Sequence, residues 1–260
     1  MEAEKLLLEN QVTIVTGGGT GIGRSIALEF AKAGADIIVA SRRLSVLKKT
    51  AKEIEAIGRH SLCITTDVSQ KTAVDNMVQK VMAEFGKIDI LVNCAGVSST
   101  LEPLLELDED DWDRSININL KGCFLCSQAV GKIMVKPKRG NIINIASVSG
   151  FRPGEGDGIY NIGKAGVIML TQVLAKQLAE YHIRVNAIAP GMTMTPLSEV
   201  RLSNQDTRRK WENFIPLGRI GEPDDVANSA LFLASEASSH ITGHTMIVDG
   251  GQMLQSRHGF

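Results

Sequence analysis

Short apolar runs rich in β-branched residues recur along the whole chain and alternate with longer segments of helical periodicity. The runs are VTIVTG at 12–17, DIIVAS at 36–41, SLCITTD at 61–67, IDILVN at 88–93, NIINIAS at 141–147, IRVNAIAP at 183–190 and HTMIVDG at 244–250. Most of them are almost continuously apolar, which is typical of strands covered on both faces. Their alternation with helices predicts a parallel sheet with right-handed crossovers. We therefore expect one α/β domain, residues 1–260, with a doubly wound parallel sheet of about seven strands and helices on both faces.

One predicted helix is apolar on nearly all sides. Between Ala165 and Ala175 only Thr171 and Gln172 are polar. A helix on one side of a sheet needs a single apolar stripe, so this pattern predicts a second buried face. A fully internal helix is the alternative, but a three-layer fold of this size rarely has one. The pattern therefore favours contact with another copy of the chain, together with the stretch 116–125.

The composition narrows the class of protein. Of the 260 residues 43% are hydrophobic and 22% are charged, and the formal net charge is −1. The chain thus lacks the basic excess of a nucleic-acid binder. No stretch reaches the roughly 18 apolar residues of a membrane span, and the opening MEAEKLLLENQ has no features of a signal peptide. We expect a cytoplasmic protein with neither a nucleic acid nor a membrane as partner.

The four cysteines give no sign of a metal site. Cys123 and Cys126 form a lone CxxC with no second pair and no nearby histidine. They fall in the apolar helical stretch CFLC, which favours packing in the core over redox chemistry. The five histidines are scattered without ligand spacing. We therefore expect no bound metal.

A glycine-rich turn follows the first apolar run. Gly17, Gly21 and Gly23 have the spacing GxxxGxG between a predicted strand and a predicted helix. Free N–H groups at a helix N-terminus bind anions, and glycine lets a pyrophosphate approach the backbone. No Lys-Ser/Thr pair follows, so a nucleotide P-loop is not indicated. A dinucleotide site and a plain tight turn remain the two interpretations.

The end of the second strand bears on the identity of the dinucleotide. An NAD site usually places an acid there, whereas this strand ends in Ser41 and Arg42, followed by Arg43. A guanidinium binds a 2′-phosphate with two hydrogen bonds, and a carboxylate would repel it. The alternative is a solvated basic start to the next helix. The pattern favours NADP(H), with NAD(H) possible, and Asp67 after the third strand is placed to accept a hydrogen bond from the adenine amine.

Three side chains are candidates for proton chemistry. Tyr160 and Lys164 are four residues apart at the start of a predicted helix, so they share a face. An ammonium group beside a phenol stabilises the phenolate and makes it a better acid–base group. Ser147 closes a predicted strand and places a hydroxyl at the carboxyl end of the sheet, where ligands of open parallel sheets bind. Taken singly, each has an ordinary structural explanation.

Together these residues resemble the single-domain short-chain dehydrogenase/reductases, which have a Rossmann-like fold. The motifs occur in the family's order as TGGGTGIG at 16–23, NCAG at 93–96, NINLKG at 117–122, Ser147, YNIGK at 160–164, PGMTMT at 190–195 and ITGHTMIVDGG at 241–251. Two positions depart from the common pattern. Cys94 replaces an asparagine that helps to brace the central sheet, and Gly163 stands where Ser or Ala usually precedes the lysine.

The resemblance implies four catalytic residues. Tyr160 would protonate the carbonyl oxygen during reduction and take the proton back during alcohol oxidation. Lys164 would favour the Tyr160 phenolate and bind the nicotinamide ribose, and Ser147 would orient the substrate carbonyl. Asn119 would hold a water that links Lys164 to solvent.

The resemblance also implies the residues of the cofactor site. Residues after the fourth strand would line the cofactor cleft, and those after the sixth would fix the nicotinamide carboxamide. The expected set is Gly17, Thr20, Gly21, Ile22, Ser41, Arg42, Asp67, Val68, Asn93, Ala95, Gly96, Tyr160, Lys164, Pro190, Gly191, Thr193 and Thr195.

The substrate is expected to be a small carbonyl compound or alcohol. The family implies two substrate loops, 150–158 and 192–214. The second combines Met192, Met194, Leu197, Trp211 and Phe214 with Arg201, Arg208, Arg209 and Lys210. The apolar set suggests a cover over an acyl chain or ring, and the basic set either meets a carrier phosphate or is a solvated helix face.

The resemblance is strongest to 3-oxoacyl reductases, and it implies a homotetramer. Sugar or polyol dehydrogenases and cyclic secondary-alcohol dehydrogenases are the alternatives, because the fold does not choose among substrates. A dinucleotide sensor without catalysis would not need the Tyr–Lys pair. A hydrolase using Ser147 would need a GxSxG turn and a His–acid partner set, which the sequence lacks.

Overall fold

The predicted parallel sheet is confirmed by the computed structural model, which describes residues 7–98, 102–153 and 158–255. Its order is β3-β2-β1-β4-β5-β6-β7, and every neighbouring pair is parallel. The strands are β1 (Val12–Thr16), β2 (Asp36–Ser41), β3 (Ser61–Thr65), β4 (Ile90–Asn93), β5 (Gly140–Ile145), β6 (Ile183–Pro190) and β7 (Thr245–Val248). From β1 the strand order runs outward to β2 and β3 on one side and to β4 through β7 on the other. At this change of order, between β1 and β4, a crevice opens at the carboxyl ends of the two strands.

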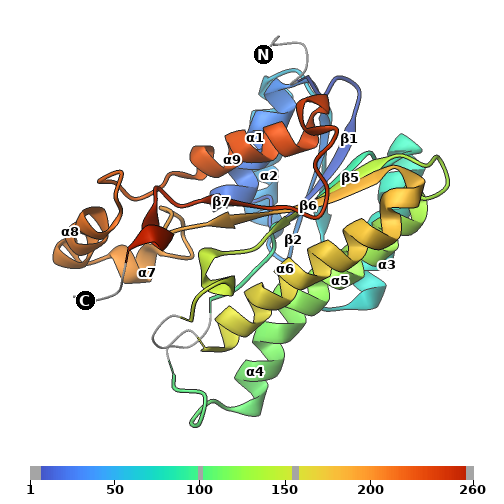
Figure 1. Cartoon of the computed structure of the whole chain (residues 1–260). Helices are drawn as coiled ribbons and strands as arrows, with labels where there is room; N and C mark the ends of the chain where they lie inside the picture. The colour runs from blue at the N-terminus through green and yellow to red at the C-terminus, as the bar shows by residue number, and fades with distance from the viewer. Residues whose placement is uncertain (1–6, 99–101, 154–157, 256–260) are drawn as a thin grey trace.

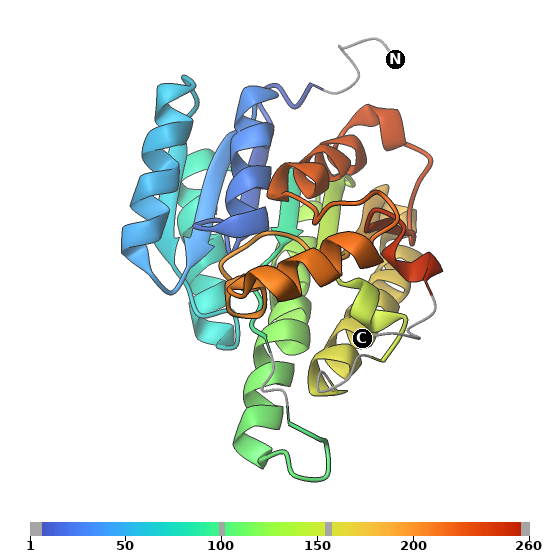
Figure 2. The same cartoon turned by 90° about the vertical axis from the view of Figure 1, so that its left-hand side faces the viewer.

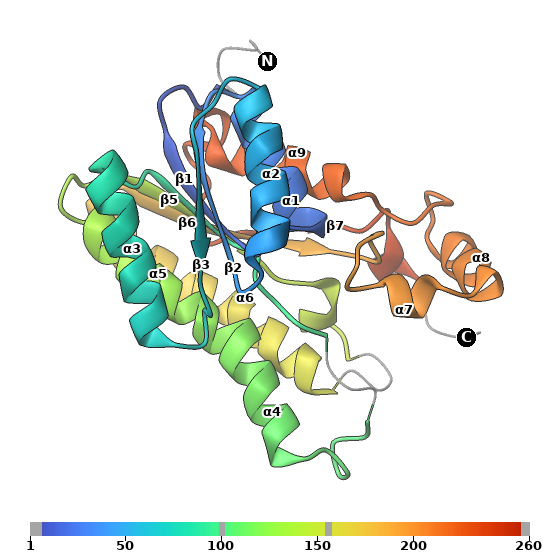
Figure 3. The same cartoon turned by 180° about the vertical axis from the view of Figure 1, so that it is seen from behind.

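Helices cover both faces of the sheet (Figures 1 and 3). The α-helices are α1 (Gly21–Lys32), α2 (Leu44–Ala56), α3 (Lys71–Phe85), α4 (Glu109–Ile116), α5 (Gly122–Met134), α6 (Gly158–Leu178), α7 (Glu199–Leu202), α8 (Gln205–Phe214) and α9 (Pro223–Ala234). Helices α1, α2 and α9 pack on one face, and α3, α5 and α6 pack on the other. Side chains of each strand alternate between these two cores, as Ile14 and Val15 of β1 do. This explains the nearly unbroken apolar runs.

Buried amides link the central strands to the helices behind them. The Asn93 amino group donates to Asn144 Oδ1 on β5 and to Ser127 Oγ on α5, both at 2.9 Å. Asn144 in turn donates to Thr171 Oγ1 on α6, also at 2.9 Å. Because an unpaired polar group in a core is costly, this network fixes how α5 and α6 sit against the sheet. Asn93 therefore braces the central sheet.

The two cysteines of the CxxC lie in the core, as predicted. Cys123 and Cys126 are buried on α5, and both are free thiols. Burial raises the pKa of the Cys123 thiol to about 12, and it also raises that of Cys126. Both side chains are neutral at physiological pH and pack as small groups in the core, where the Cys123 thiol also donates to Asn144 Oδ1 at 3.2 Å. Among the described residues no cluster of His, Cys, Asp and Glu is arranged to hold a metal ion.

A one-turn π-helix interrupts the long helix that begins at Glu109. The π-helical segment Asn117–Lys121 directly follows α4 and directly precedes α5, so no loop separates the three. Such bulges often occur at functional sites. Here the bulge carries Asn119 toward the carboxyl end of the sheet, next to α6. Within the described ranges, no helix is long and apolar enough to cross a lipid bilayer.

Candidate active site

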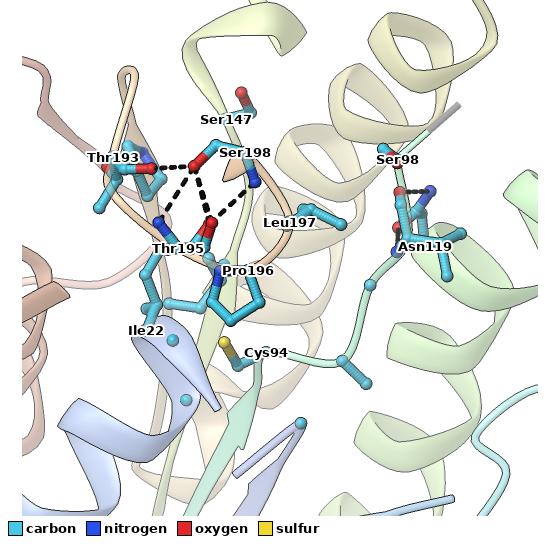
Figure 4. Close-up of a pocket in the computed structure, with 18 of the residues that line it drawn as sticks. Ile22, Cys94, Ser98, Asn119, Ser147, Thr193, Thr195, Pro196, Leu197 and Ser198 are labelled. Carbon is cyan, nitrogen blue, oxygen red and sulfur yellow. Dashed lines mark hydrogen bonds between the residues drawn. The ribbon is translucent and has the colours of Figure 1, made fainter. Parts of the chain in front are cut away.

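A cavity of about 710 Å³ lies at the carboxyl ends of the strands. Its wall contains nearly all of the site residues predicted from the sequence. They are Gly17, Thr20, Gly21, Ile22, Ser41, Arg42, Asp67, Val68, Ala95, Gly96, Asn119, Ser147, Tyr160, Lys164, Pro190, Gly191, Thr193 and Thr195. Segments far apart in the sequence therefore form one site (Figure 4).

Asn93 is the exception, and its predicted place on the cleft wall is wrong. It is the last residue of β4, and its side chain is buried among Asn144 and Ser127 instead of lining the cavity. Strand residues alternate between faces, so the position at the strand end points into the core on the α5 side. Cys94, the next residue, does line the cavity. Burial raises the pKa of its thiol to about 11, so Cys94 is neutral at physiological pH.

The glycine turn leaves no room for side chains. Gly17 and Gly21 have φ of +70° and +52°, which other residues rarely adopt. A Cβ at Gly17 would lie 2.9 Å from the Cys94 carbonyl oxygen. Thr16 Oγ1 holds the turn to the chain after β4, because it accepts the Cys94 and Ala95 N–H groups at 3.1 and 3.2 Å. The first turn of α1 carries no acid, and its residues Gly21, Ile22 and Gly23 line the cavity, so the free N–H groups of this helix end form an anion site.

The basic end of β2 also faces the cavity. Ser41, Arg42 and Arg43 all line it. The Ser41 hydroxyl is buried and has no hydrogen-bond partner among the residues that the structure describes, so a bound molecule would satisfy it. Asp67 is the sole carboxylate among the described lining residues, and Ser69 holds its Oδ1 at 2.7 Å. The cavity wall near β2 is therefore suited to an anionic ligand.

Lys164 and Tyr160 lie one turn apart on α6, as predicted. The Lys164 side chain is buried, with 6% exposed, and its Nζ donates to the Ile145 carbonyl oxygen at 2.7 Å. The same Nζ lies 5.5 Å from the centroid of the Tyr160 ring. The strand end thus fixes the ammonium group beside the phenol.

Ser147 lies two residues beyond the end of β5, so the strand is shorter than the sequence predicted. Its Oγ accepts the Ser149 N–H at 3.1 Å and begins a short 3-10 turn, Val148–Gly150. The hydroxyl proton of Ser147 is consequently available for a ligand oxygen.

Both polar atoms of the Asn119 side chain form hydrogen bonds within the protein. Its Oδ1 accepts the Val97 N–H at 3.0 Å, and its Nδ2 donates to the Val97 carbonyl at 3.1 Å and to Ser115 Oγ at 3.2 Å. Figure 4 shows this amide beside Ser98. The side chain therefore holds the chain after β4 against the π-helix. A water near Lys164 would have to use the main-chain carbonyl of Asn119 instead.

The two threonines after β6 occupy different places. Thr193 is buried, and its Oγ1 donates to the Gly191 carbonyl at 3.0 Å. Thr195 lies over the glycine turn, since a Cβ on Gly21 would be 3.3 Å from Thr195 Cβ. Ser198 links the two: its Oγ donates to the Thr193 carbonyl at 2.6 Å and accepts the Thr195 N–H at 3.0 Å (Figure 4). Ser198 was not predictable from the sequence, because a serine in a loop belongs to no periodic pattern.

The segment 192–214, called the lid segment below, lies beside the strand ends (Figure 2). Leu202 of this segment forms a small core with Ile215 and Ile220, which follow the segment in the chain, and Met192 and Trp211 pack against that core. Main-chain bonds close its base: the Met194 N–H donates to the Gly221 carbonyl at 2.8 Å, and the Gly221 N–H donates to the Met192 carbonyl at 3.0 Å.

The lid segment contributes apolar, aromatic and polar side chains to the cavity. Its apolar and aromatic lining residues are Met192, Pro196, Leu197, Trp211 and Phe214, and its polar ones are Thr193, Thr195, Ser198 and Arg201. The rings of Trp211 and Phe214 pack edge to face with centroids 5.9 Å apart.

The four basic residues predicted in the lid segment do not lie together. Arg201 lines the cavity, whereas Arg208, Arg209 and Lys210 are exposed on α8 and do not. In the first predicted loop, residues 154–157 lie outside the described ranges, and Arg152 at the start of the loop donates to the Gln255 carbonyl at 2.9 Å.

Comparison with known proteins agrees with this geometry. Residues 17–253 match the family model described as Enoyl-(Acyl carrier protein) reductase. The chain is 41% identical over 251 residues to the (2S)-[(R)-hydroxy(phenyl)methyl]succinyl-CoA dehydrogenase subunit BbsD of Thauera aromatica, covering 95% of this chain and 98% of the relative. It is 40% identical over 247 residues to the 3-oxoacyl-[acyl-carrier-protein] reductase FabG of Thermotoga maritima, covering 95% and 99%.

A solved structure extends the comparison. The putative NAD(P) dependent gluconate 5-dehydrogenase from Beutenbergia cavernae, described with bound NADP, has a TM-score of 0.92 at 31% identity. The match covers 96% of this chain and 100% of that one. A doubly wound sheet, a glycine turn and a Tyr–Lys pair at one cavity define a nicotinamide-dependent oxidoreductase of CH–OH and C=O groups. The chain belongs to the short-chain dehydrogenase/reductase family.

Proposed function

We propose that the protein reduces 3-oxoacyl thioesters with NADPH. The observation that carries the substrate class is the lid segment, whose Met192, Leu197, Trp211 and Phe214 form an apolar wall in the same cavity as Ser147. Such a wall favours an acyl chain or ring over a fully hydroxylated sugar, because buried hydroxyl groups need partners. Relatives that act on acyl thioesters support the same substrate class.

The cavity fits a phosphorylated dinucleotide. The glycine turn accommodates a pyrophosphate, which a Cβ at Gly17 would obstruct. The unpartnered Ser41 hydroxyl and the adjacent Arg42 suit a 2′-phosphate on the adenosine ribose. Asp67 Oδ2, which takes no hydrogen bond from the described residues, is placed for the adenine amine. When bound, the nicotinamide supplies the hydride.

The protein's own residues orient the substrate carbonyl and move the proton. Ser147 donates its hydroxyl proton to the carbonyl oxygen, because its acceptor side is already used by Ser149. Tyr160 is the proton donor to the same oxygen, and the Lys164 ammonium group lies beside it, 5.5 Å from the centroid of its ring. The Lys164–Ile145 bond keeps the ammonium in place through the reaction. Asn119 contributes by fixing the π-helix, whose main chain would hold a relay water.

The remaining cofactor roles follow from the loop after β6. Pro190, Gly191 and Thr193 lie where a nicotinamide carboxamide would be held, and the Thr193–Gly191 bond sets their conformation. Thr195 lies over the glycine turn, so we assign it to the pyrophosphate. Ile22, Val68, Ala95 and Gly96 would complete the walls of the cofactor site.

The substrate assignment is tested by a panel followed at the nicotinamide absorbance. It contains 3-oxoacyl thioesters of N-acetylcysteamine, cyclic ketones and keto-sugar acids, each with NADPH. We expect kcat/KM to be highest for the thioesters, by roughly tenfold or more, because the apolar wall contacts the acyl chain. A higher kcat/KM for the keto-sugar acids would replace this proposal by the sugar dehydrogenase alternative, which the gluconate 5-dehydrogenase likeness supports.

We further propose that the chain forms a homotetramer in the cytoplasm. An apolar stripe on α6, formed by Ile162, Met169 and Val173, is exposed, and so is Phe124 on α5. Met169 is the most exposed of these residues, at 58%. Positions 162, 169 and 173 fall on one helix face, which is what the all-round apolar pattern predicted. The free thiols suit a reducing compartment.

Light scattering at micromolar concentration tests the assembly. We expect the mass of four chains, and Met169→Arg should reduce it to dimers or monomers, because a charge would be buried in the contact. Ile57→Arg, at an exposed apolar residue following α2, is the matched control and should leave the mass unchanged. A monomer before any substitution would rule out the homotetramer.

A further inference from the structure

Gln252 sits at the cavity on a turn built to hold it. After β7 the backbone passes through Gly250 and Gly251, with φ of +61° and +88°, into the short 3-10 turn Gln252–Leu254. Both carboxylate oxygens of Asp249 secure this turn: they accept the Gly251 and Met253 N–H groups, each at 2.8 Å. The chain thereby carries an amide side chain back toward the loop after β6. Only 9% of Gln252 is exposed, and the residue lines the cavity.

The orientation of the Gln252 amide follows from its partner. One of its terminal atoms lies 2.8 Å from the Met192 main-chain nitrogen. That nitrogen is a donor only, so the atom facing it must be the oxygen, Oε1. Gly191 permits this approach, since a Cβ there would lie 2.6 Å from Oε1. The amino group Nε2, with two protons to donate, therefore points away from Met192, and no hydrogen bond within the described residues takes it up.

The amino group belongs to the wall on which a substrate would rest. Gln252 shares the main cavity with Ser147 and Tyr160. It also lines a smaller adjoining cavity together with Ser149 and Phe214. A donor that faces the cavity without a protein partner favours a ligand that brings an acceptor oxygen, because a ligand without one would cover the amino group and leave it unsatisfied.

We propose that Gln252 is a specificity-determining residue that binds a second acceptor oxygen of the substrate. In this arrangement Ser147 and Tyr160 bind the reacting ketone oxygen, and Gln252 Nε2 donates to the carbonyl oxygen two carbons farther along the substrate. The substrates selected in this way are 1,3-dicarbonyl compounds, such as 3-oxoacyl thioesters. The inference rests on the proposed function and names the group that distinguishes a 3-oxoacyl thioester from a simple ketone.

Two ketones of equal chain length isolate this contact. S-ethyl 3-oxobutanethioate carries the second carbonyl, and heptan-2-one does not. Gln252→Glu keeps an acceptor for the Met192 N–H but replaces the donor by an oxygen that cannot donate when ionised. Gln252→Met removes the amide altogether and serves if the glutamate variant does not fold. Gln79→Glu, at an exposed residue of α3, is the control for the same chemical change.

The quantity measured is the ratio of kcat/KM for the thioester to kcat/KM for heptan-2-one, with NADPH. We expect this ratio to fall about 10- to 100-fold in both Gln252 variants, and not in Gln79→Glu. The NADPH Kd of Gln252→Glu, measured by fluorescence, should stay that of the unsubstituted enzyme. An unchanged ratio in the Gln252 variants overturns the role of Gln252 alone. An unsubstituted enzyme that reduces heptan-2-one but not the thioester overturns the proposed function and this inference together.

Discussion

Tyr160→Phe should lower kcat for carbonyl reduction by at least about 10²–10⁴-fold, which is the usual contribution of a general acid. The substitution removes the proton donor and leaves the ring, so the packing near Lys164 is preserved. The glycine turn and the end of β2 lie on other elements and do not use the hydroxyl. We therefore expect the NADPH Kd, measured by fluorescence titration, to be unchanged while turnover is lost.

The sequence supplies a matched control for this variant. Tyr181 is the other of the two tyrosines and lies beyond the far end of α6, where it packs against the core on the α3–α5 side. Tyr181→Phe should keep the kcat of the unsubstituted enzyme. Equal turnover in Tyr160→Phe and Tyr181→Phe would refute the proton-donor role of Tyr160.

Arg42→Ala should remove most of a preference for NADPH over NADH. A charge-assisted hydrogen bond contributes about 1.5–3 kcal/mol. At about 1.4 kcal/mol per decade, this corresponds to a roughly 10- to 100-fold higher kcat/KM with NADPH. Arg42 is exposed at the cavity edge and Thr20 supplies no second cation in the glycine turn, so the effect belongs at the lower end of that range.

The kcat/KM with NADH serves as the internal control for the Arg42→Ala variant. In Arg42→Ala the kcat/KM for NADH should barely change, because NADH has no 2′-phosphate. Lys49→Ala, on an exposed part of α2 that does not line the cavity, removes the same charge and should retain the preference. An unsubstituted enzyme that prefers NADH would show that the interpretation of the β2 end is wrong. The dehydrogenase assignment would stand.

The sequence predicts the fold because local pattern and topology agree. Strands covered on both faces must be apolar at successive positions, as Ile14 and Val15 are, and the helices of a doubly wound sheet cover its strands in this way. The ends of the strands were harder to predict. Ser147 and Asp67 both lie two residues beyond the strands that were predicted to include them, because the chain leaves the sheet toward the crevice before each predicted run ends.

The site was predictable where chemistry depends on residue type at a fixed spacing. Tyr160 and Lys164 share a helix face by necessity, and a glycine turn before a helix has few other uses. Positions that depend on which way a side chain points were not predictable in this way. Asn93 turns into the core, and Gln252 reaches the cavity only through the turn that Asp249 holds.

One measurement tests the account most directly: mass spectrometry of the product formed from S-ethyl 3-oxobutanethioate and NADPH by the unsubstituted enzyme, alongside the nicotinamide absorbance. We expect NADPH to be consumed in equal amount to the 3-hydroxy thioester formed. We also expect Tyr160→Phe to form almost none of this product under the same conditions. Loss of NADPH absorbance with a keto-sugar acid while the thioester remains intact would contradict the account.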